Sequence, residues 1–529
     1  MIIITNLTTS NLKRIIKVEK QAVRIGDIVR VTQGNSSGDL GAVVTDVSHD
    51  SRQAKSGSLF VAVRGELFDA HKFIPQVMEQ GAAGILSELE PTAEWRSFAE
   101  SQSERGLAPA SWIQVKNVRR AMALAAAEVH HHPSRELNLA GITGTNGKTT
   151  CAYLIASIPE AASEPVAMTG TVEYRLGKER RKADRTTPEA TDMQRLLRQS
   201  VEIGCKTAVM ECSSQAMDFH RCDELDYAVA AFTNLTRDHL DYHKTMENYW
   251  YAKQRLFDGR LGSRPKTSVI NVDDAHGIEL ADRLEKEGLR VVRYAVKSEA
   301  DITARDPEFS LNGMRFRLST PDTEIDFHSP LVGPPHIYNT LAAVGSGLAL
   351  GYSLDVIQKA LEKCTGAPGR FERVPHDGDF AVVVDYAHSD DALLNVLRTA
   401  REVTKGRIIT VFGCGGDRDG SKRAPMGEAA GSLSDVVILT SDNPRTEDPN
   451  KILADAEVGI QKTGKPYEKI ADRREAIHHA IEQARADDLV LIAGKGHEDY
   501  QILGREVFHF DDKEVAREAL ISSDSHRAA

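Results

Sequence analysis

The sequence predicts an α/β protein of three domains, with mainly parallel sheets in its second and third domains. The chain has 529 residues, and at about 150 residues per domain this length suggests three or four domains. From residue 137 onward, short apolar runs alternate with stretches that can form helices, and each run ends in polar or glycine-rich residues. This alternation is typical of parallel sheets, which bind ligands beyond the carboxyl ends of their strands.

We assign residues 1–136 to a small N-terminal α/β domain. Its expected elements are strands within 41–48 and 58–65 and helices within 73–84 and 118–131. Pro133 ends the last of these helices. The histidines at 130–132 could suggest metal binding, but adjacent positions point to different helix faces, so we interpret them as a frayed helix end.

The second domain, 137–365, and the third, 366–529, each contain four apolar runs that predict buried strands. In the second domain these runs are LNLAGI (137–142), TAVMEC (207–212), DYAVAAFTNL (226–235) and TSVINVDD (267–274). In the third domain they begin the segments FAVVVDYAH, RIITVFGCGGDRD, DVVILTSDNPR and DLVLIAGKGHED. Each strand of the third domain leads directly into a charged cluster, which predicts a second binding edge.

Composition excludes several functional classes. Hydrophobic residues make up 41% of the chain and charged residues 27%, as in ordinary folded proteins. Lys and Arg total 66 against 77 Asp and Glu, and this net charge of −11 argues against a nucleic-acid partner. No apolar run approaches the ~20 residues that span a bilayer, and no signal peptide is recognisable, so we expect a cytoplasmic protein without membrane insertion. The six cysteines form no CxxC pair, and we expect reduced thiols.

A glycine-rich loop, TGTNGKTT at 143–150, separates the first strand of the second domain from a helical stretch. Backbone N–H groups at such a helix start bind phosphate, a lysine adds a point charge, and a threonine hydroxyl can bind Mg²⁺. The strict pattern GxxxxGK[ST] requires glycine at 142, where this chain has Ile142, so the loop is a shortened variant. The predicted phosphate site comprises Gly144, Thr145, Asn146, Gly147, Lys148, Thr149 and Thr150.

Two further strand ends carry groups that could bind a metal ion. Glu211 ends the second strand of this domain, and Asp238 and His239 follow the third. Each of them alone is more simply interpreted as a surface carboxylate or a hydrogen-bonded histidine. Together with the phosphate loop they predict a magnesium site at the sheet edge.

In the order of its motifs the chain resembles the Mur ligase family, the ATP-dependent amino-acid ligases of peptidoglycan synthesis. The matching segments extend from about residue 40 to 510, and together they are far more specific than any one of them. They include GTNGKTT, MECSSQA, NLTRDHLDYH, YAKQRLF, NVDD, GRFE, VDYAH, FGCGGDRD, SDNPR and GKGHEDYQ. The resemblance implies an N-terminal domain for a uridine nucleotide, a central P-loop ATPase and a Rossmann-like C-terminal domain for the incoming amino acid.

The resemblance also implies a reaction. ATP phosphorylates a substrate carboxylate, and the amine of the amino acid attacks the acyl phosphate to give an amide, ADP and phosphate. The implied substrates are UDP-N-acetylmuramoyl-L-alanyl-D-glutamate (UDP-MurNAc-dipeptide) and meso-2,6-diaminopimelate, with ATP and Mg²⁺ as cofactors. We expect the enzyme to be a monomer.

Residue roles carried over from the family follow its motifs. The implied catalytic residues are Lys148, Glu211, His239 and Lys253. The implied metal ligands are Thr149, Glu211, His239 and Lys253, the last as a carbamate. The implied ATP contacts beyond the loop are Asn271, Asn339, Arg370 and Asp385, and the contacts with the uridine-linked substrate are Ser51, Thr186, Thr187, Ser213 and Arg221. Without the family motif, Lys253 is simply a lysine in an aromatic-rich helix.

Three segments depart from the family pattern. The segment GPPHIYN before Asn339 differs from the usual GxFNxxN. Gln215 stands where histidine is common, and Glu66 stands where a relative has histidine near the uridine. An acidic side chain is unexpected beside an anionic nucleotide, so we expect Glu66 to face away from it.

The motif SDNPR distinguishes relatives that add different amino acids. Arg445 can pair in bidentate fashion with the distal carboxylate of diaminopimelate, whereas lysine-adding relatives usually lack this arginine. The implied amino-acid contacts are Arg418, Asp442, Asn443, Pro444, Arg445, Gly494 and Glu498. Pro444 also permits a simpler interpretation of the motif as a turn.

Two alternatives remain open at this point. A folylpolyglutamate synthase shares the P-loop and the acyl-phosphate chemistry, but the segments HDSR (49–52) and SDNPR argue against it. A P-loop switch protein would hydrolyse nucleotide without an amino-acid substrate, and it would not need the charged edge of the third domain.

Overall fold

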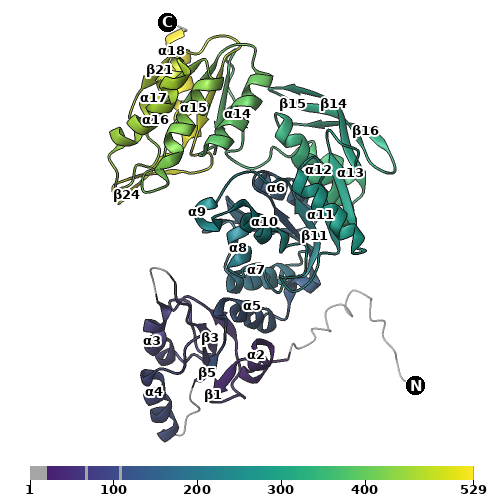
Figure 1. Ribbon diagram of the computed structural model, residues 1–529, viewed down its shortest axis with the longest axis vertical. Coiled ribbons are helices and arrows are strands. Elements are labelled where there is room, and N and C mark those ends of the chain that lie inside the picture. Colours follow the sequence, from purple (N-terminus) through teal and green to yellow (C-terminus); the bar gives the residue numbers. More distant parts are fainter. Residues whose placement is uncertain (1–20, 66–68, 106–109, 528–529) are drawn as a thin grey trace, which may run out of the picture.

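The computed structural model describes residues 21–65, 69–105 and 110–527 and contains three α/β domains arranged along one long axis (Figure 1). The N-terminal domain lies at one end and the C-terminal domain at the other, and the central domain with its eleven-stranded sheet lies between them. This confirms the predicted fold class. The domain boundaries near residues 136 and 365 remain predictions, and residues 1–20 and Glu66 lie outside the described residues.

The N-terminal domain is built on a five-stranded sheet in the order β1-β5-β4-β3-β2. Its strands are β1 (Asn35–Ser37), β2 (Asp46–Ser48), β3 (Ser58–Val61), β4 (Gly84–Ser87) and β5 (Ser111–Gln114), and only β1 is antiparallel to its neighbour. Its helices are α2 (Ile25–Thr32), η1 (Ala70–Phe73), α3 (Ile74–Glu79), α4 (Ala93–Glu104) and α5 (Val118–Val129). The predicted strands and helices are all found, although most are shorter than their sequence patterns.

The histidines at 130–132 follow the end of α5 and precede η2 (Pro133–Glu136), as the helix stop at Pro133 predicts. His130 Nε2 lies 3.2 Å from a carboxylate oxygen of Asp46, and His132 Nε2 lies 3.2 Å from one of Glu128. These two rings therefore contact different carboxylates, which supports a structural interpretation over a shared metal.

The central domain has an eleven-stranded sheet in the order β16-β15-β14-β13-β12-β11-β6-β10-β7-β8-β9. Its strands are β6 (Asn138–Thr143), β7 (Val166–Thr169), β8 (Glu173–Leu176), β9 (Glu179–Lys182), β10 (Thr207–Glu211), β11 (Tyr227–Phe232), β12 (Thr267–Asn271), β13 (Val291–Ala295), β14 (Ile302–Ser310), β15 (Gly313–Ser319) and β16 (Glu324–Ser329). The strands from β14 to β7 pair in parallel, and antiparallel strands extend the sheet at both ends. Because β6 lies between β10 and β11, the segments that follow these three strands meet at one edge.

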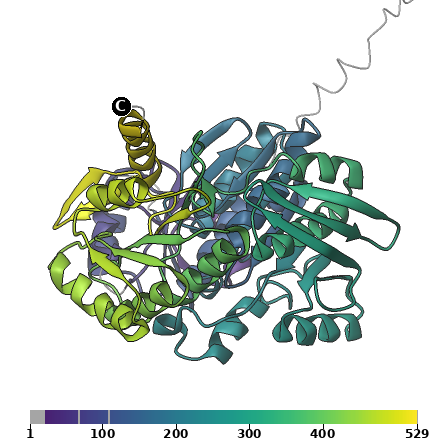
Figure 2. The same ribbon diagram turned by 90° about the horizontal axis from the view of Figure 1, so that it is seen from above.

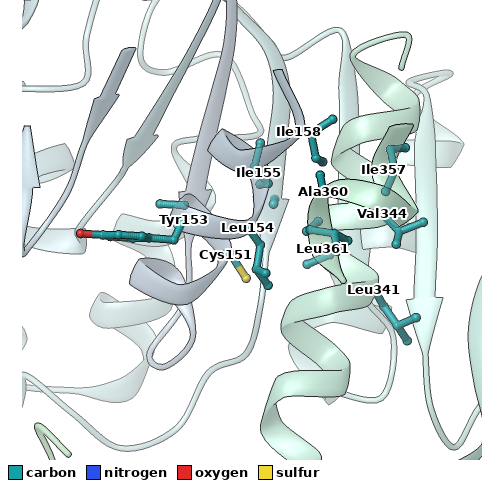
Figure 3. Close-up of a cluster of buried hydrophobic side chains, with 14 of the residues drawn as sticks. Cys151, Tyr153, Leu154, Ile155, Ile158, Leu341, Val344, Ile357, Ala360 and Leu361 are labelled. Carbon is teal, nitrogen blue, oxygen red and sulfur yellow. The ribbon is translucent and has the colours of Figure 1, made fainter. Parts of the chain in front are cut away.

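The helices of the central domain are α6 (Lys148–Ala161), α7 (Ala190–Glu202), α8 (Ser214–Asp218), α9 (Leu240–His243), α10 (Met246–Gln254), α11 (Ala275–Lys286), α12 (Pro334–Ala349) and α13 (Leu354–Leu361). Figure 3 shows apolar side chains of α6 facing those of α12 and α13. Leu154, Leu341 and Leu361 are fully buried in this cluster. The cluster holds α6 against its neighbours, and this fixes the position of the phosphate loop at the start of α6.

Replacing Leu154 with alanine should lower the free energy of unfolding of the central domain by about 2–5 kcal/mol. The side chain is 0% exposed, so the substitution removes apolar contacts and leaves a cavity that close-packed neighbours fill only in part. Denaturant unfolding followed by tryptophan fluorescence would measure the loss. The control Ile278→Ala changes a 44% exposed side chain on α11 and should cost less than about 0.5 kcal/mol. An equal loss in both variants would contradict the prediction.

The C-terminal domain has a six-stranded sheet in the order β17-β18-β22-β19-β20-β21, parallel except for β17. Its strands are β17 (Glu372–Arg373), β18 (Ala381–Asp385), β19 (Ile408–Phe412), β20 (Val436–Leu439), β21 (Tyr467–Lys469) and β22 (Leu489–Ala493), followed by the hairpin β23 (Tyr500–Leu503) and β24 (Glu506–His509). Its helices are α14 (Asp390–Val403), η3 (Gly420–Lys422), α15 (Arg423–Leu433), α16 (Pro449–Thr463), α17 (Arg473–Glu482) and α18 (Asp512–Arg527). They cover both faces of the sheet, as Figure 2 shows, in agreement with the predicted Rossmann-like arrangement.

All six cysteines are free thiols; five are buried and Cys364 is partly exposed. None of the helices formed by the described residues combines the length and the apolar composition that a membrane span requires.

Candidate functional site

The phosphate loop follows β6 and turns into α6 through two glycines with positive φ. Gly144 has φ 150° and Gly147, the N-cap residue of α6, has φ 90°. A Cβ atom on Gly144 would lie 1.8 Å from Thr233 Oγ1, and one on Gly147 would lie 2.4 Å from Asn339 Oδ1. A side chain at Gly144 would therefore displace Thr233, which follows β11, and a side chain at Gly147 would displace the Asn339 side chain on α12. The loop thus leaves the backbone N–H groups at the start of α6 open to a ligand.

Two lysines donate to the same carbonyl of this loop. Lys148 Nζ donates to the carbonyl oxygens of Gly144 and Thr145, each at 2.9 Å, and Lys253 Nζ donates to Gly144 O at 2.8 Å. Burial lowers the pKa of Lys148, although Glu211 and Asp238 act in the opposite direction. The side chain of Lys253 is 1% exposed, and burial together with the charge of Lys148 lowers its pKa well below the ordinary value. Its ammonium form is therefore disfavoured.

The carboxylate of Glu211 is fully buried at the end of β10 and is held from two sides. Its Oε2 accepts hydrogen bonds from Thr149 Oγ1 at 3.0 Å and Thr171 Oγ1 at 3.1 Å. Its Oε1 accepts from the backbone N–H of Thr171 at 2.8 Å. The structure thus brings Glu211 to Thr149, as the sequence predicts. Thr171 was not predicted; it follows β7, which pairs with β10, and this neighbouring strand end is the signal that could have identified it.

Residues predicted to contact the uridine-linked substrate continue from Glu211. The Oγ1 atoms of Thr171 and Thr186 lie 3.1 Å apart. Thr187, which is 1% exposed, donates to the carbonyl of Glu211 at 2.7 Å, and Ser213 caps α8 by accepting from Ala216 N–H. Thr186 and Ser213 face the pocket described below, whereas Thr187 supports the backbone behind it.

His239 and Tyr249 border the other side of the loop. His239 has φ 54°, and its Nε2 lies 3.5 Å from Asp238 Oδ2. Burial lowers the pKa of His239, which favours the neutral ring that can bind a metal ion. The Tyr249 ring packs between this histidine and Lys253, with Lys253 Nζ 4.4 Å from the ring centroid.

These groups line a pocket of about 400 Å³ between the central and C-terminal domains. The central domain contributes Thr145, Asn146, Gly147, Lys148, Thr149, Thr150, Thr171, Thr186, Glu211, Ser213, Ser214, Gln215, Asp238, His239, Asp241, Tyr249 and Lys253. The C-terminal domain contributes Arg370, Tyr386, His388, Ser389, Ala392 and Lys422. Among the described residues, no three His, Cys, Asp or Glu side chains are grouped in a way that could hold a metal ion.

Of the four ATP contacts predicted beyond the loop, Asn271, Asn339 and Asp385 have mainly structural contacts. Asn271 donates to Thr233 O at 2.7 Å, and Asn339 lies against Gly147. Asp385 accepts from the backbone N–H of Phe371 at 2.7 Å, and burial raises the pKa of this carboxyl. Of the four, Arg370 alone lines the pocket, with its guanidinium carbon 4.8 Å from the ring centroid of Tyr386. Its Nε is buried and has no hydrogen-bond partner among the described residues, which leaves it available to a ligand.

A second pocket, of about 450 Å³, lies beside the first and is lined by residues of the C-terminal domain and by Asp241 of the central domain. It is lined by Asp241, Tyr386, His388, Cys414, Gly415, Arg418, Asp419, Lys422, Arg423, Met426, Asp442, Asn443, Arg445, Gly494, Glu498 and Tyr500. Every predicted amino-acid contact except Pro444 is in this set. Asp241, Tyr386, His388 and Lys422 line both pockets, so a group in one lies next to a group in the other.

The loop SDNPR shapes one wall of this second pocket. Arg445 has φ 52°, and its Nη1 donates to Gly416 O at 2.7 Å. Asn443 donates to Glu498 Oε2 at 3.1 Å. A Cβ atom on Gly416 would lie 1.9 Å from Pro444 O, so Pro444 contributes through its backbone to a close loop contact.

Besides Thr187 and Pro444, two further predicted substrate residues lie outside both pockets. Ser51 is 6% exposed within the N-terminal domain. Arg221 pairs with Glu189 at 2.7 Å, and the same carboxylate lies 3.4 Å from Arg185 and 4.0 Å from Arg119 on α5. Three guanidinium groups around one carboxylate leave an excess of positive charge where the N-terminal and central domains meet. The sequence motifs identified only Arg221 in this cluster.

Comparison with known proteins agrees with this geometry. Three family profiles match in order: the Mur ligase family catalytic domain at residues 43–130, the Mur ligase middle domain at 142–347 and the Mur ligase glutamate ligase domain at 369–496. The UDP-N-acetylmuramoyl-L-alanyl-D-glutamate–2,6-diaminopimelate ligase of Geobacter sulfurreducens is 43% identical over 523 residues, covering 95% of this chain and 100% of the relative. The ligase of the same name from Solibacter usitatus is 44% identical over 477 residues, covering 90% and 93%.

A solved structure of a ligase with this name superposes with a TM-score of 0.68 at 33% identity, covering 95% of this chain and all of the other. Sequence relatives of nearly full length, a solved fold and the motif-bearing pockets therefore all agree, and the chain belongs to the Mur ligase family.

Proposed function

We propose that the protein is an ATP-dependent ligase that joins meso-2,6-diaminopimelate to UDP-N-acetylmuramoyl-L-alanyl-D-glutamate in peptidoglycan precursor synthesis. The observation that carries the proposal is the pair of adjoining pockets, one at the phosphate loop and one at the loop SDNPR, which share four lining residues. An amide-forming reaction requires this adjacency, because the amine must reach the activated carboxylate before water does.

At the first pocket the loop N–H groups and Lys148 would bind the nucleotide phosphates. A carboxylate is a poor electrophile, and its phosphorylation turns one oxygen into a leaving group. The negative charge that develops requires fixed positive groups, and Lys148 and Arg370 line the pocket on opposite domains. At the second pocket, Arg445 would bind the distal carboxylate of the amino acid and Glu498 its ammonium group.

The residues around Glu211 fit a magnesium ion by their chemistry, since the hydroxyl of Thr149 and the carboxylate of Glu211 supply oxygen ligands next to the phosphate loop. Thr149, Glu211 and His239 would hold the ion, which would neutralise phosphate charge. Thr171, which shares the Glu211 carboxylate, would keep that carboxylate in place.

We further propose that Lys253 carries a carbamate in the active enzyme. A neutral amine is the form that attacks CO₂: its lone pair forms the N–C bond, one C–O π bond of CO₂ opens and leaves its electrons on oxygen, and the nitrogen loses one proton to water. The low pKa of Lys253 supports this, because burial and Lys148 disfavour the ammonium form. The product would place a negatively charged, carboxylate-like group next to Lys148, whose Nζ donates to the same Gly144 carbonyl.

Replacing Lys253 with arginine should lower kcat by about 100-fold, because arginine keeps a positive charge and cannot form the carbamate. The unaltered enzyme should also lose activity in CO₂-depleted buffer and regain it on addition of bicarbonate. Phosphate release is the measurement. The control Lys266→Arg changes an exposed lysine of the same domain and should retain full activity and full bicarbonate dependence. Either of two results would contradict the carbamate: a Lys253→Arg variant with the kcat of the unaltered enzyme, or an unaltered enzyme whose activity does not depend on bicarbonate.

The uridine-linked substrate would reach from the central pocket to the junction with the N-terminal domain. The excess of positive charge around Glu189 supports binding of an anionic diphosphate there by Arg221. The roles of Ser51, Thr186, Thr187 and Ser213 remain predictions, as do the monomeric state and the cytoplasmic location.

One assay tests the proposed function. Purified protein, ATP, Mg²⁺ and the uridine-linked dipeptide are mixed with diaminopimelate, with lysine or with neither, and phosphate release is followed. We expect rapid release with diaminopimelate and little with lysine. Release that is the same in all three mixtures would favour a nucleotide-hydrolysing switch protein and overturn the ligase assignment.

A further inference from the structure

Lys495 is a fully buried lysine that no step of the proposed reaction uses. It stands two residues beyond the end of β22, and its side chain is 0% exposed. Its Nζ donates to Asn443 Oδ1 at 3.0 Å and to the carbonyl of Tyr500 at 2.6 Å. It also lies 3.5 Å from Asp442 Oδ1 and 3.9 Å from Glu498 Oε2. A buried cation is costly unless it is paired, and every one of these partners lines the second pocket.

The contact with Lys495 fixes the orientation of the Asn443 amide. Asn443 Oδ1 accepts from Lys495 and also from the backbone N–H of Ile502 at 3.0 Å. Because both donors face the oxygen, the amide nitrogen must point the other way, where it donates to Glu498 Oε2. Lys495 therefore acts on Glu498 through Asn443 as well as by its own charge.

Lys495 also balances two carboxylates that face the pocket. Burial and the neighbouring Asp442 raise the pKa of Glu498, while Lys495 lowers it. Without the lysine, Asp442 and Glu498 would lose the ammonium group that lies 3.5 Å from the one and 3.9 Å from the other, and Glu498 would more readily take up a proton. A protonated Glu498 would bind a substrate ammonium poorly.

The same lysine anchors the hairpin next to the loop SDNPR. Its bond to Tyr500 O holds the start of β23, and β23 then bonds back to that loop. Gln501 Nε2 donates to Asp442 O at 2.8 Å, and the Arg445 N–H donates to Ile502 O at 3.1 Å. Lys495 thus supports both Glu498, the proposed contact for the substrate ammonium, and Arg445, the proposed contact for its distal carboxylate.

We propose that Lys495 is a positioning residue for the incoming amino acid: from behind the pocket wall it orients Asn443 and Glu498 and so sets the affinity for the substrate ammonium group. This inference rests on the proposed function, because it assumes that the second pocket binds an amino acid.

The test is a set of KM values for Lys495→Met. We expect the KM for diaminopimelate to rise about 10- to 100-fold, while the KM values for ATP and for the uridine-linked dipeptide stay within about threefold. A purely structural role would instead lower the melting temperature or kcat without this selective change in KM. The control Lys462→Met removes a 58% exposed lysine from α16 of the same domain and should leave all three KM values unchanged.

A double variant makes the test specific to the path through Asn443. In an Asn443→Ala background, Lys495→Met should raise the KM for diaminopimelate by a smaller factor than in the unaltered enzyme, because the amide that connects Lys495 to Glu498 is already absent. If Lys495→Met does not fold, Lys495→Gln, which keeps a donor but no charge, replaces it in the same measurements. An unchanged KM for diaminopimelate in the folded variant would overturn the inference. Absence of diaminopimelate-dependent phosphate release by the unaltered protein would overturn the proposed function instead.

Discussion

Replacing Lys148 with methionine should lower kcat for ligation by about 10³-fold or more, the largest loss that we expect from a single substitution. Lys148 Nζ lies at the phosphate loop, where it donates to the carbonyls of Gly144 and Thr145, and the side chain lines the nucleotide pocket. Methionine has a similar length and no charge, so it removes a positive side chain from the pocket that we propose binds the nucleotide phosphates. Phosphate release under saturating substrates measures the effect.

The two bonds of Lys148 to backbone carbonyls raise a structural alternative, in which the lysine mainly closes the loop. Thermal unfolding separates the two roles, because loss of loop closure lowers the melting temperature, whereas loss of charge stabilisation lowers kcat. The matched control Lys266→Met removes an exposed lysine of the same domain and should change neither quantity. A kcat within threefold of the unaltered enzyme would contradict a role for Lys148 in the reaction.

The central sheet shows which parts of this fold the sequence could predict. The strands β6, β10, β11 and β12 are continuous apolar runs, because both faces are buried, and all four were predicted. The strands β14 to β16 were not predicted. In β14, most positions between 305 and 310 are exposed and no apolar run marks the strand. The strands β15 (GMRFRLS) and β16 (EIDFHS) do alternate apolar and polar residues, and this period of two could have identified them.

Some residues of the candidate site could likewise be predicted from the sequence, whereas others are recognised only in the structure. Residues carried by local motifs, such as Lys148 and Arg445, could be predicted to lie at a site because one loop fixes their spacing, and both line the pockets. Thr171 was missed, because a threonine after a four-residue strand belongs to no motif and reaches Glu211 only through the pairing of β7 with β10. Lys495 lies in the motif GKGHEDYQ, yet its burial beneath Asn443 depends on the hairpin β23–β24 and is visible only in three dimensions.

Replacing Arg445 with alanine should lower kcat/KM for diaminopimelate by about 10²- to 10³-fold and leave the KM for ATP unchanged. The guanidinium is held at the pocket wall by its bond to Gly416 O, which leaves its remaining N–H groups for a planar carboxylate. Loss of a charge-assisted bidentate contact in a desolvated pocket costs about 3–4 kcal/mol, which corresponds to this factor. Arg445→Lys should recover little of the activity, since an ammonium group cannot form the bidentate contact.

The comparison of diaminopimelate with lysine as substrate makes this prediction specific to the distal carboxylate. Lysine has no such group, so Arg445→Ala should leave the already low rate with lysine nearly unchanged and thereby reduce the preference for diaminopimelate. The control Arg398→Ala removes an exposed arginine from α14 of the same domain and should retain the full preference. If Arg445→Ala lowered the rates with both amino acids by the same factor, the arginine would support the pocket wall through Gly416 and would not select the substrate.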